Sequence, residues 1–307
     1  MKTPITRVSQ IKHLGLDIET VPDRELHEYE PTVRVYIERK LARAKASDPT
    51  MTYDKFASLH PNFGRVVCFS IGYMGENANG EPAMALKTYA GSEPELLEAF
   101  VRVAGPFRGV WVHYNGRAFD VPFLVSRLRH HRILGVSPHF ADLCRPNGHG
   151  HIDMLEYHSL GEALRRLPLG VLASLEGLPS PKSDLDGSKI ADAFRQGEIA
   201  RIGRYCEWDV ATVLNLQRML VDGLEPVRSE NLFSVDCDGE YRQLAAARDD
   251  GSCPSAWYED NRLYLPTVVE RNVTPAQPGP GVLLCEDGKI TKDDLQAMSD
   301  RENCKAS

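Results

Sequence analysis

The sequence predicts an α/β protein in which three strands precede alternating helices and a buried strand. The segment IKHLGLDI (residues 11–18) is a short, mostly apolar run that leads into acidic residues. Two further runs, FGRVVCFSIGYM (63–74) and EPAMALKTYAG (81–91), are rich in β-branched or aromatic residues and are separated by the turn-like sequence GENANGEP. This order predicts three successive strands with a hairpin between the second and the third.

A helix and another strand follow the hairpin. Ser92 has the character of an N-cap, with Glu95 three residues later, and it opens the helical sequence PELLEAFVRVA, which stops before Gly105. The expected elements after it are a buried strand (108–116), an amphipathic helix (119–134), a polar Gly/His/Pro loop (135–150) and helical stretches (153–223). The chain therefore alternates strand and helix after its three opening strands, which favours a mixed sheet flanked by helices.

Two segments differ from this body. Residues 24–60 carry a charged helical pattern between the first two strands, and we interpret them as an insertion that lies over the sheet edge and can border a substrate groove. Residues 225–307 are rich in Asp, Gly and Pro, with only short β-like pieces. We expect residues 1–224 to form the functional domain and residues 225–307 to form an irregular acidic C-terminal extension.

The composition fits a globular protein of considerable size. The 307 residues are 42% hydrophobic and 26% charged, enough for a substantial core. The net charge of −7 comes from the extension, because residues 225–307 contain 9 basic and 16 acidic residues, whereas residues 1–224 contain 27 of each. Charge therefore neither supports nor excludes a nucleic-acid substrate.

The sequence also favours a cytoplasmic protein. No apolar run approaches the roughly 20 residues that span a bilayer, and the first residues lack the features of a signal peptide. The seven cysteines are scattered and include no CxxC pair, which is typical of free thiols in a reducing compartment rather than of a disulfide framework or a thiolate zinc site.

Three short motifs carry candidate catalytic groups. The first is Asp17-Ile18-Glu19-Thr20, at the expected end of the first strand, where side-chain alternation sends Asp17 and Glu19 to one side of the sheet. Two adjacent carboxylates repel each other unless a cation lies between them, and hard oxygen ligands suit Mg²⁺ or Mn²⁺. By itself, a pair of acids at a strand end is more often solvated than bound to metal.

The other two motifs lie near helices. The sequence Asn115-Gly-Arg-Ala-Phe119-Asp120-Val-Pro-Phe123 places Asp120 in the first turn of a helix, where an acid also simply complements the helix dipole. In Tyr205-Cys-Glu-Trp-Asp209, the i, i+4 spacing puts Tyr205 and Asp209 on one helical face, as an ordinary amphipathic helix also does.

Taken together and in this order, the forms DIET, NxxxFDxP and YxxxD resemble the DEDD exonuclease superfamily in its tyrosine-containing, DnaQ-like branch. The sequence is most similar to the proofreading exonuclease of family B DNA polymerases as it occurs in stand-alone proteins, over roughly residues 10–223. This resemblance implies an RNase H-like fold, with a mixed central sheet whose first three strands are antiparallel and which is flanked by helices.

The resemblance further implies a two-metal 3′-5′ exonuclease that releases nucleoside 5′-monophosphates. Its two divalent cations, Mg²⁺ or Mn²⁺, would be held by four metal ligands: Asp17, Glu19, Asp120 and Asp209. Tyr205, by the same resemblance, orients the attacking water. Because a free tyrosine has a pKa near 10, hydrogen bonding and positioning suit it better than general-base action.

The resemblance also suggests substrate contacts at single-stranded or frayed 3′ ends. Backbone and hydroxyl groups at Glu19 and Thr20 would contact the terminal 3′-OH, and Asn115 the adjacent sugar-phosphate. Phe119 and Phe123 either stack on terminal bases or pack in the core, with core packing favoured for Phe119. Lys182 is a candidate for the substrate backbone, and the basic run Arg127 to Arg132 fits either a solvated helix face or phosphate contacts.

Several alternatives stay open from sequence alone. Nothing in the motifs senses a 2′-OH, so DNA is favoured over RNA only by likeness to proofreading domains, and an exoribonuclease is the first rival. A catalytically silent nucleic-acid-binding module is the second rival. Asp153 is interpreted as a helix cap rather than a fifth metal ligand, and His149-Gly150-His151 as a mobile loop rather than a zinc site. The acidic extension is a possible protein-binding segment, and no membrane partner is expected.

Overall fold

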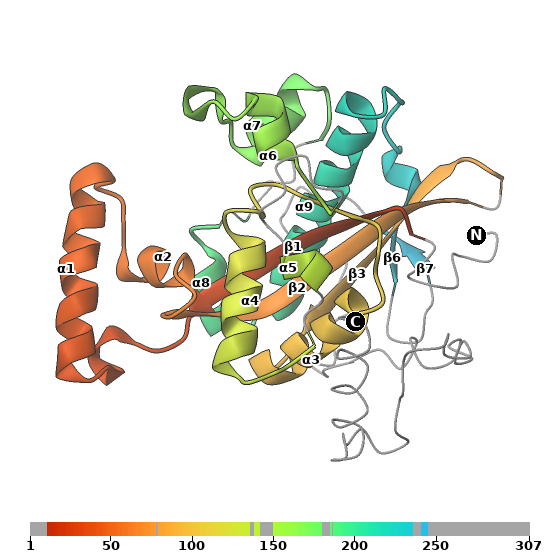
Figure 1. Cartoon of the computed structure of the whole chain (residues 1–307). Coiled ribbons are helices and arrows are strands. Elements are labelled where there is room, and N and C mark those ends of the chain that lie inside the picture. The colour runs from red at the N-terminus through yellow and green to blue at the C-terminus, as the bar shows by residue number, and fades with distance from the viewer. Residues whose placement is uncertain are drawn as a thin grey trace, which may run out of the picture. The chain divides into compact units, whose positions relative to one another are not determined.

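The computed structural model describes residues 11–77, 79–135, 138–141, 150–179, 185, 187–235 and 241–244. Within these residues the strands form one sheet of seven, in the order β5-β4-β1-β2-β3-β6-β7. Its central strands β1, β2 and β3 are labelled in Figure 1. The strands are β1 (His13–Pro22), β2 (Gly64–Glu76), β3 (Pro82–Ala90), β4 (Val110–His113), β5 (His151–Asp153), β6 (Leu232–Val235) and β7 (Tyr241–Gln243).

The sheet has the topology expected of an RNase H-like fold. Strands β1, β2 and β3 are antiparallel, and the hairpin between β2 and β3 pairs Glu76 with Pro82. On the other side of β1, strands β4 and β5 run parallel to it. The predicted mixed sheet with three antiparallel opening strands is thereby confirmed.

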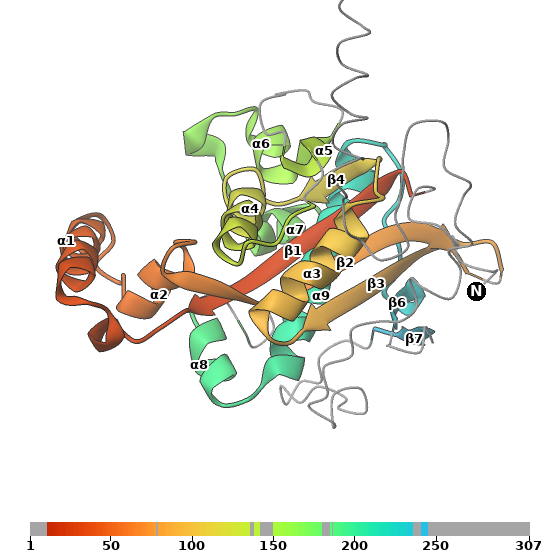
Figure 2. The same ribbon diagram turned by 60° about the horizontal axis from the view of Figure 1, so that its bottom comes forward.

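Helices cover both faces of the sheet. The longer ones are α1 (Pro31–Ser47), α3 (Glu93–Ala104), α4 (Asp120–His130) and α9 (Ile199–Leu220), and the shorter ones are α2 (Tyr53–Ser58), α5 (Pro138–Ala141), α6 (Met154–Ser159), α7 (Leu169–Leu175) and α8 (Ile190–Arg195). Figures 1 and 2 show α3 and α4 on one face and α9 on the other. None of the helices in the described ranges is both long and apolar enough to cross a bilayer.

Side-chain alternation along β1 separates two hydrophobic cores. Leu14, Leu16 and Ile18 pack with Phe100 of α3 and other residues of α3 and α4 in one cluster. The intervening positions of β1 face α9, whose buried residues form a second cluster with β3 and α7. The acids of β1 therefore lie on the α9 face, as the period of two requires.

The helix after the hairpin begins and ends close to the prediction. Ser92 is the N-cap of α3, but its hydroxyl bonds to the Glu95 side chain rather than to a backbone N–H group. The next helix, α4, is shorter than expected and ends at His130. A strand that the sequence analysis did not predict is β5, whose three residues are too few to show a period.

The insertion is helical, but it does not lie over an edge strand. It contains a short 3₁₀ turn (Leu26–Glu28), α1 and α2, and Figures 1 and 2 show α1 beyond the end of β1. Ile37 of α1 is fully buried with Ala57 and Phe63 in a small separate cluster. The guanidinium of Arg195 on α8 makes two contacts with Asp54, at 2.8 and 2.9 Å. The insertion therefore lies beyond the carboxyl end of β1 (Figure 1) and is joined there to α8.

The sheet continues past residue 224, where we expected the body of the protein to end. Strand β6 pairs in parallel with β3, from Met84 opposite Leu232 to Leu86 opposite Ser234. The Ser234 hydroxyl donates a hydrogen bond of 2.9 Å to the buried carboxyl of Glu207 on α9. Residues 225–307 are therefore not irregular throughout, while residues 245–307 lie outside the described part of the chain.

Two glycines allow α9 to lie directly on the sheet. A Cβ atom at Gly15 would lie 2.8 Å from Val210 Cγ1 and 2.9 Å from Leu214 Cγ. A Cβ atom at Gly72, which pairs with Gly15 across β1 and β2, would lie 2.7 Å from Leu86 Cδ2 and 2.9 Å from Val210 Cγ1. Any side chain at either position would force Val210 and Leu214 of α9, or Leu86 of β3, to shift.

We expect Gly15→Ala and Gly72→Ala each to destabilise the protein by about 1–3 kcal/mol, because overpacking a dense core forces side chains or backbone to shift. Urea unfolding measures the change. Gly75→Ala is the matched control in β2, since a Cβ atom there would meet nothing within 4 Å. Equal stability of the Gly15, Gly72 and Gly75 variants would show that α9 is not held in contact with these strands.

The basic run on α4 is divided between the interior and the surface. Arg127 is 1% exposed, and its Nε and Nη2 atoms lie 2.8 and 2.5 Å from the two carboxylate oxygens of Glu93. His131 lies 2.7 Å from the same carboxylate, and these bonds hold the pKa of Glu93 below its usual range despite burial. Arg127 and His131 therefore tie α4 to α3, while Arg129 is exposed.

Arg127→Leu should cost about 3–5 kcal/mol of stability, because it leaves the Glu93 carboxylate buried without its main partner. Arg129→Leu, two residues away on the exposed side, should change stability by no more than about 0.5 kcal/mol. Thermal and urea unfolding of the two variants provide the comparison. A small effect of Arg127→Leu would contradict the buried ion pair.

Candidate active site

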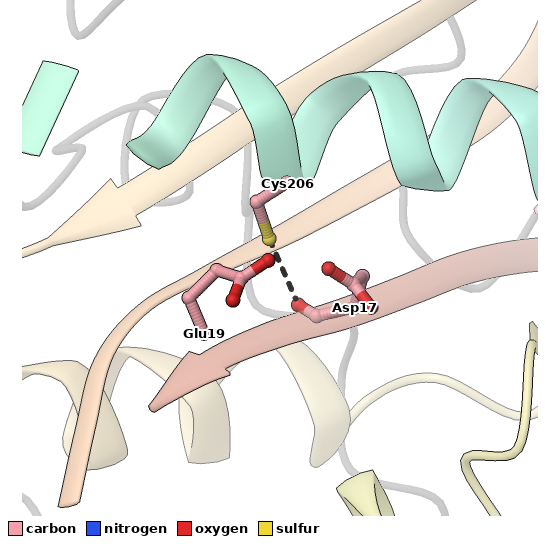
Figure 3. A group of neighbouring side chains, drawn as sticks. All are labelled: Asp17, Glu19 and Cys206. Carbon is pink, nitrogen blue, oxygen red and sulfur yellow. Dashed lines mark hydrogen bonds between the residues drawn. The ribbon is translucent and has the colours of Figure 1, made fainter. Parts of the chain in front are cut away.

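Asp17 and Glu19 lie on the α9 face of β1, close to a thiol from α9. One carboxylate oxygen of each acid and the Sγ atom of Cys206 lie within 4.8 Å of one another (Figure 3). The Cys206 thiol donates a hydrogen bond of 3.4 Å to the Asp17 carbonyl. A β-bulge follows between Glu19 and Thr20, and the Thr20 hydroxyl donates to the Ser58 carbonyl of α2 at 2.7 Å.

Asp120 approaches the same strand from α4. Its side chain is 3% exposed, and its Oδ1 atom accepts a 3.1 Å hydrogen bond from the backbone N–H of Ile18. Strand β4 pairs with β1 only as far as Gly15, so the edge of β1 beyond this residue is open to a side-chain acceptor. Asp120 is thereby fixed beside the segment that carries Asp17 and Glu19.

Tyr205 and Asp209 come from α9, one helical turn apart. They are 8% and 9% exposed, and the Tyr205 hydroxyl bonds to the Asp209 side chain. The charges of Asp209 and Asp120 both raise the pKa of Asp17, beside the larger effect of burial, so Asp17 lies close enough to interact with each of them. The structure therefore brings together the four predicted acids and Tyr205 from β1, α4 and α9, with Asp17 and Glu19 in the tightest group.

The carboxylates of this group are protonated more readily than usual. Burial is the first cause that raises the pKa of Asp17 and of Glu19 well above their ordinary values, and repulsion from neighbouring acids is the second. Burial also raises the pKa of Asp120 to about 7, an increase that the electrostatic interaction with His113 partly offsets. The Asp17 Oδ2 atom is buried and has no hydrogen-bond partner among the described residues. These converging hard oxygen donors fit a divalent cation, which would remove the repulsion.

The phenol of Tyr205 stays protonated in this environment. Burial raises its pKa first, and the charges of Asp209, Glu19 and Asp17 raise it further. A protonated phenol is a hydrogen-bond donor and acceptor but a very weak base. The position suits orientation of a bound water or phosphate oxygen.

Residues 57–223 match a family described as "Predicted 3′-5′ exonuclease related to the exonuclease domain of PolB". The matched segment is more than half of the 307 residues. The chain belongs to this exonuclease family. The matched segment includes Asp120, Tyr205 and Asp209, and it begins after Asp17, Glu19 and α1. The suspected relationship to the exonuclease domain of family B polymerases is thus confirmed.

Among solved structures, the chain is similar to the family B DNA polymerase from the hyperthermophilic archaeon Pyrobaculum calidifontis. The two are 18% identical with a TM-score of 0.43, over 69% of this chain and 24% of the polymerase chain. The chain therefore spans about a quarter of the length of that polymerase. No curated protein matches the chain.

The NxxxFDxP motif of this exonuclease family member forms a tight turn held by Asp153. Asn115 has a left-handed backbone, with φ of 65°, and a Cβ atom at Gly116 would lie 2.5 Å from Cγ of His113. The Asp153 carboxylate accepts the N–H groups of Asn115 at 2.8 Å and Arg117 at 3.1 Å. It also accepts the Leu155 N–H group and caps α6, as predicted.

Two buried histidines lie behind this turn: His113, which was not singled out from the sequence, and His151, which was predicted to lie in a mobile loop. His113 Nε2 lies 3.0 Å from His151 Nδ1, and His151 Nε2 lies 2.9 Å from the Phe140 carbonyl. His113 Nδ1 lies 3.5 Å from Asp153 Oδ2. Since a carbonyl only accepts, His151 Nε2 carries a proton. His151 is therefore a buried residue of β5 and not part of a mobile loop, while His149 lies outside the described residues.

Cys206 is the site residue that sequence reasoning missed. Its thiol lies beside the acids because α9 turns residue 206 toward β1, with Tyr205 before it and Asp209 three residues later. Cys68, also a buried free cysteine, pairs with Glu19 in the sheet, and its thiol forms a hydrogen bond with the Cys206 thiol. The pairing of Cys68 with Glu19 was the signal that could have pointed to thiols beside the acids. It could not be used, because strand register cannot be deduced from one sequence.

The predicted substrate contacts divide into three groups. Phe123 is 1% exposed within the core, so no face of its ring is available to a base, and this prediction is corrected. Phe119 is half-buried, with its ring centroid 5.4 Å from that of Phe123, and it remains a candidate together with Asn115. The Thr20 hydroxyl already donates to Ser58, and Lys182 lies outside the described residues.

The raised carboxyl pKa values predict how the metal-free protein responds to pH. A carboxyl whose pKa is raised to about 7 in the folded state, as for Asp120, binds its proton more tightly folded than unfolded. Its contribution to stability is complete below its unfolded pKa, about 4, and is lost as the pH rises through about 7. Thermal unfolding in EDTA should therefore show lower stability at pH 8 than at pH 5.

Asp120→Asn should reduce this loss of stability, whereas Glu98→Gln on the exposed side of α3 should not. Identical pH profiles for wild type and Asp120→Asn would refute the assignment of Asp120.

Mn²⁺ at about 100 times its Kd should stabilise the protein by about 2.7 kcal/mol. The effect should be larger at pH 8, because the ion binds carboxylates and not carboxylic acids. Thermal unfolding with and without Mn²⁺ measures it.

Proposed function

We propose that this protein is a metal-dependent 3′-5′ exonuclease that hydrolyses single-stranded nucleic acid from its 3′ end and releases nucleoside 5′-monophosphates, with DNA as the favoured substrate. The observation that supports this proposal is the convergence of four buried or half-buried acids, Asp17, Glu19, Asp120 and Asp209, around the second half of β1. Membership in a family related to the polymerase B exonuclease domain supports the same reaction.

The acids would supply the ligands for two divalent cations, Mg²⁺ or Mn²⁺. Such cations, when bound, would activate a water for attack on the phosphorus and stabilise the leaving 3′ oxygen. Asp17 interacts electrostatically with each of the other three acids, has one buried oxygen that is unbonded among the described residues, and would suit a ligand shared by both ions. Asp120 is oriented by Ile18 and Asp209 by its helix, so the ligand set is arranged before substrate arrives.

The uncharged groups of the site act on the substrate. Tyr205 keeps its proton and orients the attacking water through its hydroxyl, which adjoins Asp209. Asn115 presents its side chain from a turn fixed by Asp153 and suits a contact to the sugar-phosphate. Phe119, half-buried at the N-cap of α4 and packed against the core, is the candidate for a contact with the terminal base.

The proposal is tested by digestion of 5′-labelled single-stranded DNA and RNA of equal sequence, with Mn²⁺ or with EDTA. Wild type should give a metal-dependent ladder that shortens from the 3′ end, faster on DNA. Asp17→Asn should give none, because the shared ligand is lost. A ladder of equal intensity from Asp17→Asn would exclude the proposed site, and faster cleavage of RNA would assign the enzyme to RNA.

Tyr205→Phe should retain measurable activity, with a loss smaller than the roughly 10²- to 10⁴-fold effect of removing a general base. The phenylalanine ring fills the same buried space and lacks only the hydroxyl. Single-turnover rates at saturating Mn²⁺ separate this effect from metal binding. A Tyr205→Phe variant as inactive as Asp17→Asn would assign the tyrosine a direct role in proton transfer.

A further inference from the structure

Helix α1 has an exposed basic face that the site described above does not use. Its 17 residues include five basic residues and one acid, Glu38. Only Ile37 and Leu41 are buried in it. The five basic residues are Arg34, Arg39, Lys40, Arg43 and Lys45. None of them forms an ion pair with another residue in the described part of the chain.

Four of the residues of α1 share one face of the helix. Tyr36, Lys40 and Arg43 follow the spacing i, i+4 and i+7, and Arg39 precedes Lys40. All four are exposed, and Tyr36 is 48% exposed. The Lys40 Nζ atom lies 5.6 Å from the centroid of the Tyr36 ring. We call these four residues the α1 basic face.

The α1 basic face is joined by internal side-chain contacts to the segment that carries the acids. The Tyr36 ring lies 6.3 Å from that of Phe63, which in turn lies 4.6 Å from the His60 ring. Two residues before His60, the Ser58 carbonyl accepts the Thr20 hydroxyl, directly after Glu19. The path from Tyr36 to Glu19 is therefore made of contacts between neighbouring groups.

The position of α1 is fixed rather than loose. Ile37 is fully buried against Ala57 and Phe63, and the Tyr29 ring packs edge-on against Phe63 at 6.0 Å. Arg195 of α8 contacts Asp54 of α2 and, at 3.3 Å, Glu25, so both ends of the insertion are joined to the body. A charged face held in this way keeps one position relative to the acids.

We propose that the α1 basic face binds the phosphate backbone of the nucleic-acid strand whose 3′ end lies among the acids. The occupant is a single strand, because the face pairs unneutralised cations with an exposed aromatic ring, and this combination suits phosphates together with unstacked bases. The proposal rests on the proposed function for the location of the 3′ end. Residues 31–47 lie outside the family match at 57–223, so the face is not part of the matched domain.

The test compares two full-length variants that lose the same charge. One is Arg39→Gln/Lys40→Gln/Arg43→Gln on α1. The control is Lys12→Gln/Arg102→Gln/Arg228→Gln, which removes three exposed cations at the amino end of β1, on α3 and before β6. Fluorescence anisotropy measures binding of a labelled 24-nucleotide single-stranded DNA in EDTA, over a range of salt concentrations. Circular dichroism and thermal unfolding check that both variants fold.

We expect the α1 variant to bind about 10- to 100-fold more weakly at 0.1 M salt, and its logarithmic salt dependence to be shallower by about 2, because each phosphate contact on a single strand contributes about 0.7. The control should differ from wild type by less than about twofold. Tyr36→Leu, which keeps an apolar contact with Phe63, should weaken binding about fivefold or more through loss of stacking. Equal binding by the α1 variant and the control would overturn the proposal.

Hydrolysis separates this proposal from the proposed function. The α1 variant should keep the wild-type kcat but show a raised KM for the 24-nucleotide strand, because the face binds the strand away from the bond that is cleaved. If wild type binds but does not cleave, the α1 basic face stands and the exonuclease proposal falls. If an oligoglutamate peptide competes as strongly as DNA of equal charge, the face binds acidic polymers in general and its assignment to a nucleic acid is overturned.

Discussion

The contact between α9 and the two glycines of the sheet determines the rest of this structure. Gly15 and Gly72 pair with each other across β1 and β2, and together they leave room for Val210 and Leu214 of α9. Because α9 lies this close to the sheet, its earlier turns bring Asp209, Cys206 and Tyr205 close to Asp17 and Glu19. A larger spacing between helix and sheet would leave the acids of β1 without their partners from α9.

This close packing has an electrostatic cost. Asp17 and Glu19 are carboxylates in a region that burial and repulsion make unfavourable for negative charge. Hydrogen bonds hold the strand segment that carries them in place. The Cys206 thiol donates to the Asp17 carbonyl, and the Asp120 carboxylate accepts the Ile18 N–H group. Burying these acids side by side lowers the stability of the metal-free protein, and a cation bound between them would restore part of it. Such local strain is common at functional sites.

Much of the fold and the core of the site could be predicted from sequence because they depend on local periods. The alternation of β1 placed Asp17 and Glu19 on one face, and the helical repeat placed Tyr205 and Asp209 on another. What could not be predicted depends on pairing between distant segments. Strand β5, the approach of Cys206 to Glu19, and the burial of Phe123 and Arg127 all follow from tertiary contacts that no local pattern contains.

Strand β6 has a consequence for how the chain can be shortened. It covers the outer edge of β3 with backbone hydrogen bonds, and Ser234 completes the hydrogen bonding of Glu207. A chain cut at residue 224 would uncover Met84 to Leu86 on the edge of β3 as a template for intermolecular sheet pairing. It would also remove one hydrogen-bond partner from the buried carboxyl of Glu207. The apparent border in composition at residue 225 is therefore a poor place to divide the protein, and aggregation of such a fragment would reflect an uncovered strand rather than a lost activity.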